Sequence, residues 1–262
     1  MDLGLNNKVV LVTGGSQGIG LACAQGFAAE GARVAIASRS PAHLQAAVTQ
    51  LRQQGHSVLP VVADLADAEQ APRMADEVAA QLGPIQVLVT SAGAARRSPP
   101  AELTAAHWLA AMQAMYFTTI HALQAVLPGM AARGEGAVVN IIGMGGKIAT
   151  PLHLPGGAAN AALMLATAGL GHVHAAQGVR VNGVNPGPIA TGRLEEGLQA
   201  QVRLSGGTLA AARAELAARQ PGGRIALPEE VADVVLFLAS ARARHVNGAL
   251  LSLDGGATPI VV

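Results

Sequence analysis

Short apolar runs alternate with longer segments of helical periodicity along most of the chain. The runs are built largely from Val, Ile, Leu and Ala without regular polar alternation, which is typical of strands buried on both faces of a parallel sheet. The pattern predicts strands at residues 9–13, 33–37, 58–62, 85–89, 137–142, 179–184 and 250–253. It predicts helices at residues 18–30, 41–54, 68–82, 103–132, 160–176 and 229–240. Because crossovers between parallel strands are right-handed, we expect an α/β fold with one doubly wound parallel sheet and helices on both faces.

The chain length favours one large domain over two small ones. The sequence has 262 residues, and neither an internal repeat nor a linker interrupts it. A single hydrophobic core is common at this size. An Ala-, Leu- and Arg-rich stretch of helical character, residues 191–219, separates the sixth strand from the last helix. We therefore expect one domain over residues 1–262 that carries this stretch as an insertion.

The composition bears on the core and on possible partners. Hydrophobic residues make up 51% of the chain but aromatic residues only 2%, so small aliphatic side chains must build the core. Charged residues make up 13%, against about a quarter in a typical domain. So little charge favours a surface covered by further copies of the chain, although an Ala-rich monomer remains an alternative. The net charge of +1 and the lack of a basic block argue against a nucleic-acid partner.

Cysteine, histidine and the N-terminal segment point to an ordinary cytoplasmic protein. Cys23 is the single cysteine and falls in the first predicted helix, where a buried structural thiol is expected. The first residues have no apolar signal core, and prolines interrupt the longest uncharged stretch, residues 148–179. We therefore expect no membrane segment. His121, His172 and His174 lie on predicted helices without companion metal ligands, so no metal site is expected.

A glycine-rich turn lies directly between the first predicted strand and the first predicted helix. Residues 13–20 read Thr-Gly-Gly-Ser-Gln-Gly-Ile-Gly. Gly14 allows a sharp turn, Gly18 lets the backbone approach a pyrophosphate, and Gly20 lets helix and sheet pack closely. The helix then presents free N–H groups and a partial positive charge to the phosphates. This context predicts a dinucleotide site.

The spacing Gly-x-x-x-Gly-x-Gly resembles the short-chain dehydrogenase/reductase family, and the likeness extends over nearly the whole chain. Similar motifs follow at Asp64-Leu65, at residues 90–93 (Thr-Ser-Ala-Gly), at residues 178–191 and at Asp254-Gly255-Gly256. The resemblance implies a Rossmann-like fold, a nicotinamide cofactor and a small alcohol or carbonyl substrate under a lid at residues 191–219. Taken together, these motifs indicate cofactor contacts at Gly14, Ser16, Gln17, Gly18, Ile19, Gly20, Ser38, Arg39, Asp64, Leu65, Ala92, Gly93, Pro186, Gly187, Ile189 and Thr191.

The end of the second strand bears on which dinucleotide is bound. An acidic residue there would hydrogen-bond a ribose 2′-hydroxyl and repel a 2′-phosphate. This chain has Ser38-Arg39 instead, and a guanidinium forms charge-assisted contacts with phosphate. We therefore expect NADP(H) rather than NAD(H), with a solvated surface arginine as the alternative for Arg39.

The residues that carry proton transfer in the family are missing here. The family uses a Tyr as proton donor, a Lys four residues later, a Ser that holds the oxygen, and an Asn on the preceding helix. Alignment places Met115 in the Asn position, Gly143 in the Ser position, Gly156 in the Tyr position and Asn160 in the Lys position. The single tyrosine, Tyr116, is followed four residues later by isoleucine, so no Tyr-x-x-x-Lys exists anywhere in the chain.

Three residues are candidates for replacement catalytic groups. His153 lies three residues before the Tyr position, and an imidazole exchanges protons near neutral pH. Lys147 follows the fifth strand, and Ser91 lies near the nicotinamide end of the sheet. An ordinary loop histidine and a solvated loop lysine are the plainer interpretations of the first two.

Three hypotheses about function follow. The first is an atypical NADP(H)-dependent oxidoreductase with a non-standard proton donor. The second is a catalytically inert NADP(H)-binding sensor or partner subunit. The third is a scaffold that has lost both activity and ligand. The resemblance also implies a dimer or tetramer formed through the helix at 160–176 and the long helix before it, whereas substrate identity stays open between apolar and anionic molecules.

Overall fold

The computed structural model describes residues 2–93 and 95–260. It contains a seven-stranded sheet in the order β3-β2-β1-β4-β5-β6-β7, in which every neighbouring pair is parallel. The strands are β1 (Val9–Thr13), β2 (Arg33–Ser38), β3 (Val58–Val62), β4 (Val87–Thr90), β5 (Gly136–Ile141), β6 (Val179–Pro186) and β7 (Leu250–Leu253). This order reverses direction between β1 and β4. In such a sheet, ligands bind outside the carboxyl ends of the strands at that point.

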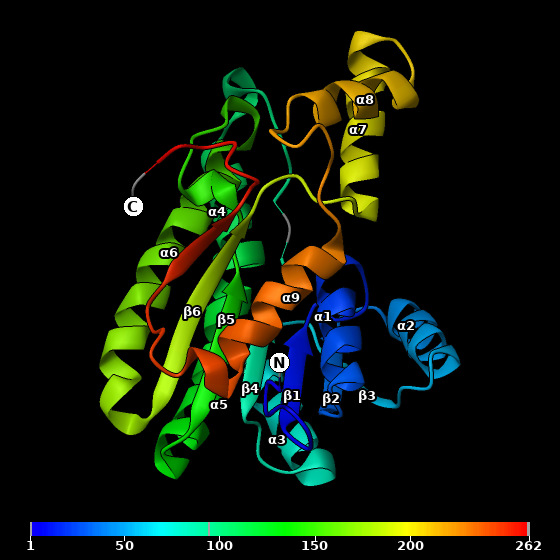
Figure 1. Cartoon of the computed structure of the whole chain (residues 1–262). Coiled ribbons are helices and arrows are strands. Elements are labelled where there is room, and N and C mark those ends of the chain that lie inside the picture. The colour runs from blue at the N-terminus through cyan, green and yellow to red at the C-terminus, as the bar shows by residue number, and fades with distance from the viewer. Residues whose placement is uncertain (1, 94, 261–262) are drawn as a thin grey trace.

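Helices cover both faces of the sheet, as the alternating pattern predicts (Figure 1). One face carries α1 (Gly18–Ala29), α2 (Pro41–Gln53) and α9 (Pro228–Ala239). The other carries α3 (Gln70–Leu82), α5 (Thr118–Arg133) and α6 (Leu154–His174). Helix α4 (Ala105–Ala111) leads into α5, and α7 (Gly192–Ser205) and α8 (Leu209–Ala218) stand beyond the carboxyl ends of the strands (Figure 1). The single-domain α/β fold with a doubly wound parallel sheet is therefore confirmed.

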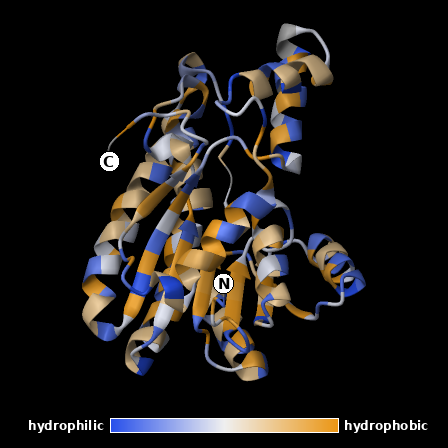
Figure 2. Cartoon of the chain, in the orientation of Figure 1, coloured by the Kyte–Doolittle hydropathy of each residue, from blue (hydrophilic) through white to orange (hydrophobic). Residues whose placement is uncertain are grey.

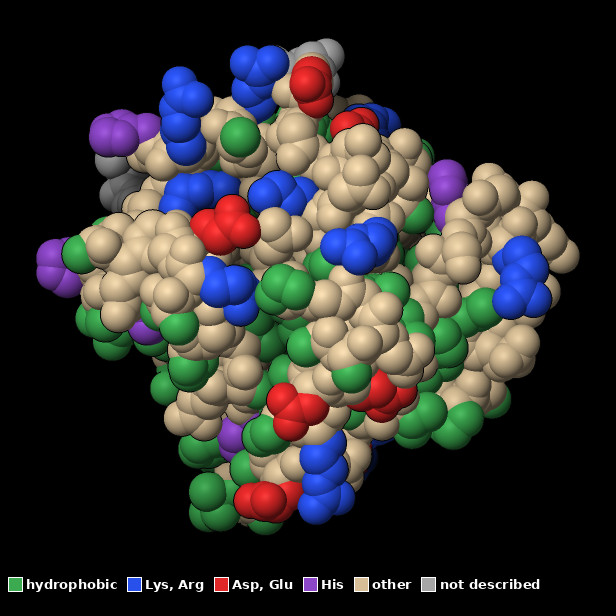
Figure 3. Space-filling model, turned by 90° about the horizontal axis from the view of Figure 1, so that it is seen from below, with side chains coloured by type: hydrophobic (Ala, Val, Ile, Leu, Met, Phe, Trp, Pro, Cys, Tyr) green, Lys and Arg blue, Asp and Glu red, His purple; other side chains and the backbone are tan. Residues whose placement is uncertain are grey.

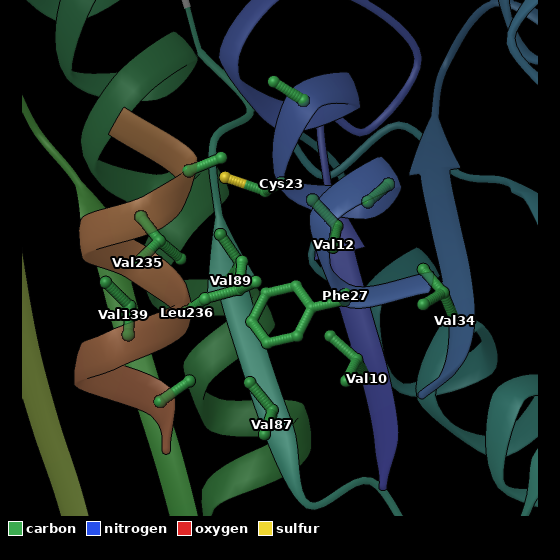
Figure 4. Packing of buried hydrophobic residues seen from close by; sticks show 14 of the residues in the cluster. Val10, Val12, Cys23, Phe27, Val34, Val87, Val89, Val139, Val235 and Leu236 are labelled. Atoms are coloured by element: carbon green, nitrogen blue, oxygen red, sulfur yellow. The ribbon is translucent and has the colours of Figure 1, made fainter. Parts of the chain in front are cut away.

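Aliphatic side chains build the core, as the low aromatic content requires. The central strands are strongly apolar, whereas β6 also carries hydrophilic residues (Figure 2). Phe27 of α1 is fully buried and lies among valines of β1 and β4 and Leu236 of α9 (Figure 4). Cys23 is buried in the same cluster, and this burial raises the pKa of its thiol to about 12. At neutral pH it is therefore a protonated, inert thiol, as expected.

Two helix predictions need correction. The helix expected at 160–176 begins six residues earlier, at Leu154, so Gly156 and Asn160 share one helix instead of lying on a loop and a helix. Pro155 lies in the first turn, where its missing N–H costs nothing. The helix expected at 103–132 is divided by a π-helical segment, η2 (Met112–Phe117), between α4 and α5. Segments of this kind are frequent at functional sites.

Two surface features complete the description. Seen from the amino-terminal edge of the sheet, basic and acidic side chains are interspersed without a large patch of one sign (Figure 3). None of the helices in the described part of the chain is long and apolar enough to span a membrane.

Candidate active site

The glycine-rich turn packs against the end of β4. A Cβ on Gly14 would lie 2.7 Å from the backbone nitrogen of Ala92, and Gly14 itself has φ +67°. A Cβ on Gly20 would overlap the carbonyl oxygen of Gly14. Both positions therefore need glycine, because the neighbouring atoms are backbone and cannot move aside. The close approach brings the turn to the point in the sheet where strand order reverses.

The N-terminus of α1 is open towards this point. Its N-cap, Gln17, makes no side-chain capping bond, and the first turn contains no acidic residue. The first N–H groups of the helix are thus available to an anion, with the helix dipole behind them. A Cβ on Gly18 would lie 3.3 Å from Cγ2 of Thr191, so the segment after β6 borders the same opening. These features fit the pyrophosphate of a dinucleotide.

The positions expected to contact the rest of the cofactor lie along the carboxyl edge of the sheet. Arg39 is exposed at the end of β2, and it makes no ion pair within the described residues. The Asp64 carboxylate accepts a hydrogen bond from the Ala66 backbone N–H at 3.1 Å. Gly93 has φ +144°, and a Cβ there would lie 3.0 Å from the carbonyl oxygen of Ala114 in η2. The other expected positions also lie at the ends of strands or in the segments that follow them. Ser16 lies in the glycine-rich turn, Ile19 in α1, Ser38 at the end of β2 and Leu65 after β3. Pro186 ends β6, and Gly187 and Ile189 follow it.

Three glycines surround two polar side chains at the other half of this edge. A Cβ on Gly143 would lie 3.4 Å from Nδ2 of Asn160, and one on Gly145 would lie 3.2 Å from the same atom. A Cβ on Gly156 would lie less than 3.0 Å from three atoms of the His153 ring. We call Gly143, Gly145 and Gly156 the glycine cluster. The imidazole of His153 thus fills the space in which a side chain at position 156 would begin.

Buried polar atoms without partners concentrate here. Among the described residues, the buried side-chain atoms that lack a hydrogen bond are His153 Nδ1, Asn160 Oδ1, Asn185 Oδ1 and Asp254 Oδ2. Asn185 donates its amide to the carbonyl oxygen of Gly143 at 2.9 Å, which ties it to the glycine cluster. A buried polar group left unsatisfied is costly. Three of these atoms belong to residues at the glycine cluster, so the folded chain leaves polar groups uncompensated there.

Positive charge borders His153. The Ser98 backbone N–H donates to the Leu152 carbonyl at 3.1 Å, which holds the loop that carries Arg97 against the turn that carries His153. Arg193, at the start of α7, donates to the Gly93 carbonyl at 2.7 Å. Desolvation, with the nearby charges of Arg97 and Arg193, lowers the pKa of His153 below its usual 6.5. The imidazole is therefore neutral at pH 7.

The other expected residues are placed differently. Lys147 donates to the Leu250 carbonyl and to the Ser252 hydroxyl, each at 3.0 Å, so its ammonium group is held by β7. Ser91 lies against Gly14 of the glycine-rich turn. Met115 lies under Gly93, and Tyr116 packs edge-on against Phe117. Of the three replacement candidates, His153 alone is brought to the glycine cluster.

A buried polar network beneath the site was not expected from the sequence. The Thr90 hydroxyl donates to Oδ1 of Asn140 at 2.8 Å, and Asn140 donates to the Thr167 hydroxyl at 2.9 Å. All three residues are buried, so the network joins β4, β5 and α6 at fixed positions. The signal for it was an asparagine within an otherwise apolar strand. No local sequence pattern links Arg97 and Arg193 to His153.

The doubly wound fold, the glycine-rich turn and the open helix N-terminus are typical of the class of dinucleotide-binding proteins. Residues 14–258 match the family model described as enoyl-(acyl carrier protein) reductase. The chain is 37% identical over 254 residues to cis-4-hydroxycyclohexanecarboxylate dehydrogenase of Sinomonas cyclohexanicum, covering 97% of both proteins. It is 36% identical over 261 residues to D-threitol dehydrogenase of Mycolicibacterium smegmatis, covering 98% of this chain and 95% of the relative. The chain belongs to the short-chain dehydrogenase/reductase family.

A solved relative has nearly the same fold. The structure of L-sorbose reductase from Gluconobacter frateurii, complexed with NADPH and L-sorbose, superposes with a TM-score of 0.93 at 30% identity and covers both chains completely. The resemblance seen in the sequence motifs is confirmed at the level of the family and the fold.

Proposed function

We propose that this protein is an NADP(H)-dependent oxidoreductase that interconverts a small alcohol and the corresponding carbonyl compound, with His153 as the proton-transfer residue. The observation that carries the proposal is the overlap between the His153 ring and the side-chain space of Gly156. A group that exchanges protons near neutral pH thus lies where the family carries its tyrosine. The degenerate family positions Met115, Gly143, Gly156 and Asn160 motivate the search for such a group.

The chemistry of His153 follows from its protonation state. Because its pKa is lowered, the ring is neutral at pH 7 and can accept the proton of a substrate hydroxyl as the alcohol is oxidised. In the reverse direction the protonated ring would donate that proton to the carbonyl oxygen. A bound nicotinamide dinucleotide would supply or accept the hydride.

Preference for NADP(H) rests on Arg39. Its guanidinium is exposed at the end of β2 and has no acidic partner among the described residues. A ribose 2′-phosphate would supply that partner through charge-assisted hydrogen bonds. The L-sorbose reductase relative was solved with NADPH, which agrees with this preference.

The relatives suggest substrates for the first assays. Their names specify a cyclic hydroxy acid, a four-carbon polyol and a ketose. The test is cofactor turnover with a panel of these compounds, using both NADP(H) and NAD(H). His153→Gln should reduce turnover by about 10²–10⁴-fold, the usual loss when a general acid or base is removed. His172→Gln, on α6, is the matched control and should leave turnover unchanged. Full turnover by His153→Gln would exclude His153 as the proton carrier.

An inert NADP(H)-binding sensor or partner subunit is the second candidate. The four changed family positions favour it, because Gly143, Gly156 and Met115 offer no exchangeable side-chain proton. It predicts dinucleotide binding by calorimetry without turnover of any panel compound. Turnover that depends on His153 separates the first candidate from this one.

We also propose a homo-oligomer and a lid. Leu165 and Val173 of α6 are 78% and 65% exposed, and Leu109 of α4 is 71% exposed. Such apolar side chains are suited to contacts between copies of the chain, so light scattering should give a dimer or tetramer, which Leu165→Glu should weaken. The inserted helices α7 and α8 at residues 191–219 stand beyond the strand ends, as a substrate lid would.

A further inference from the structure

The charges of two arginines from distant parts of the chain, Arg97 and Arg193, act on His153, and neither arginine forms a salt bridge among the described residues. Arg193 reaches from the start of α7 to the Gly93 carbonyl at 2.7 Å, across a sequence separation of 100 residues. Arg97 is held beside His153 by the backbone bond from Ser98 to Leu152. Neither forms one of the ion pairs found among the described residues, whereas Arg213 and Arg224 each do. The charge of Glu196 raises the pKa of Arg193, but the two side chains form no salt bridge.

This arrangement has a cost for the folded chain. The positive charges of Arg97 and Arg193 disfavour protonation of the His153 imidazole. Arg193 is also partly desolvated, and this lowers its pKa although some of the side chain remains exposed. Arg97 is exposed, and positive charges that lack an ion-pair partner and act on a titratable side chain suit a site that binds the opposite charge.

We propose that Arg97 and Arg193 form an anion subsite, which selects substrates that carry a carboxylate at one end and the reacting hydroxyl or carbonyl group at the other. The inference rests on the proposed function and adds the substrate class to it. Arginine suits this role because its planar fork matches the two oxygens of a carboxylate. The glycine cluster and His153 lie beside the subsite, so the reacting group of the same molecule would reach the imidazole.

The pyrophosphate of the dinucleotide is the competing partner for Arg193. Thr191, two residues earlier, borders Gly18 of the phosphate-binding turn, so the guanidinium is not far from that end of the cofactor. Arg97 is different, because its loop is tied to Leu152 and not to the turn. If substitution of either arginine weakens binding of the same anion, that anion binds at the substrate subsite and not at a cofactor contact.

The experiment compares benzoate with benzamide, which have nearly the same shape but differ in charge. Binding of each to the protein saturated with NADP⁺ is measured by calorimetry, which requires no turnover. Benzoate should bind about tenfold or more tightly than benzamide, as expected when charge-assisted hydrogen bonds form. Arg97→Gln and Arg193→Gln should each bring this ratio towards one while benzamide binding stays unchanged. Arg96→Gln, on the same loop, is the matched control and should keep the ratio.

Three results would overturn the subsite. Equal binding of benzoate and benzamide to the unmodified protein would do so, as would a ratio that survives both arginine substitutions. A loss of NADP⁺ affinity in Arg193→Gln, with benzoate binding retained, would assign that arginine to the cofactor instead. Failure of the proposed function is seen separately, as absence of turnover with neutral and anionic alcohols alike. Thermal melting of each variant checks that it is folded.

Discussion

The site has two halves that use glycine in opposite ways. The nucleotide half is the glycine-rich turn at residues 13–20, and the chemistry half is the glycine cluster with His153. In the nucleotide half, Gly14 and Gly20 approach backbone atoms, so no other residue fits. In the chemistry half, the atoms nearest to a Cβ at Gly143 and Gly156 belong to the side chains of Asn160 and His153. In the first half a larger residue would overlap backbone atoms, whereas in the second it would displace a side chain. A glycine is therefore required where backbone lies next to it, and replaceable where a side chain can move aside.

The largest effect is expected from Gly156→Ala. The new Cβ would overlap the His153 ring, so the imidazole must move away from its position. Turnover should fall by about 10²–10⁴-fold, while NADP(H) affinity stays unchanged because the nucleotide half is untouched. Steady-state kinetics and calorimetry measure the two quantities. Gly169→Ala, where a Cβ meets nothing within 4 Å on the same helix, is the control. Unchanged turnover in Gly156→Ala would show that turnover does not depend on the position of the His153 ring.

The next effect is on cofactor choice and tests the nucleotide half. Arg39→Asp should weaken NADP(H) binding by about tenfold or more, because a charge-assisted contact is lost and a repulsive one is introduced. NAD(H) binding should be retained or improved, since an acidic residue can accept from the ribose 2′-hydroxyl. Calorimetry with both dinucleotides gives the ratio. Arg52→Asp, in the last turn of α2, should leave that ratio unchanged.

A smaller effect is expected from pH. Because the pKa of His153 is lowered, kcat/KM for alcohol oxidation should level off above a pKa lying below 6.5 and fall about tenfold per pH unit beneath it. Arg97→Gln removes a positive charge beside the ring, so the pKa should rise and the profile should move to higher pH. The same lowered pKa means that the unfolded chain binds this proton more readily. His153 therefore decreases stability as the pH falls through 6.5 and below. A pH profile that does not move in Arg97→Gln would contradict this placement.

The smallest effect is on stability and compares the two kinds of glycine directly. Gly20→Ala should lower the free energy of unfolding by about 1–3 kcal/mol, because the added methyl group is forced against the Gly14 carbonyl. Gly169→Ala, which has open space and sits within α6, should be neutral or stabilising by up to about 1 kcal/mol. Chemical denaturation measures both. Equal effects would mean that the backbone around Gly14 is free to adjust.

The sheet could be predicted from the sequence because each strand is a compact apolar run flanked by turn residues. The nucleotide turn could be predicted because its chemistry lies within eight consecutive residues, 13–20. The start of α6 could not, since Pro155, Gly156 and Gly157 have low helix propensity and the predicted helix begins only at residue 160. Tertiary packing overrides that propensity here: a Cβ on Gly157 would lie 2.8 Å from the Gly145 carbonyl, so the glycines allow the helix to begin early.

The charge environment of His153 could not be predicted either. Its three components come from positions 97, 153 and 193, and only the fold brings them together. The sequence offered the imidazole as a candidate proton carrier, but neither its overlap with Gly156 nor its neutral state at pH 7 has a local signature. Long-range electrostatics of this kind depend on burial and distance, which residue spacing does not determine.

The buried thiol of Cys23 has a practical consequence for all of these measurements. Because it is fully buried on α1 and its pKa is about 12, alkylating reagents can reach it only when that helix leaves the core. It is the single cysteine of the chain, so its labelling rate reports how often α1 opens. A bound dinucleotide should lower this rate as its occupancy rises, so the labelling rate measures dinucleotide affinity even in variants without turnover.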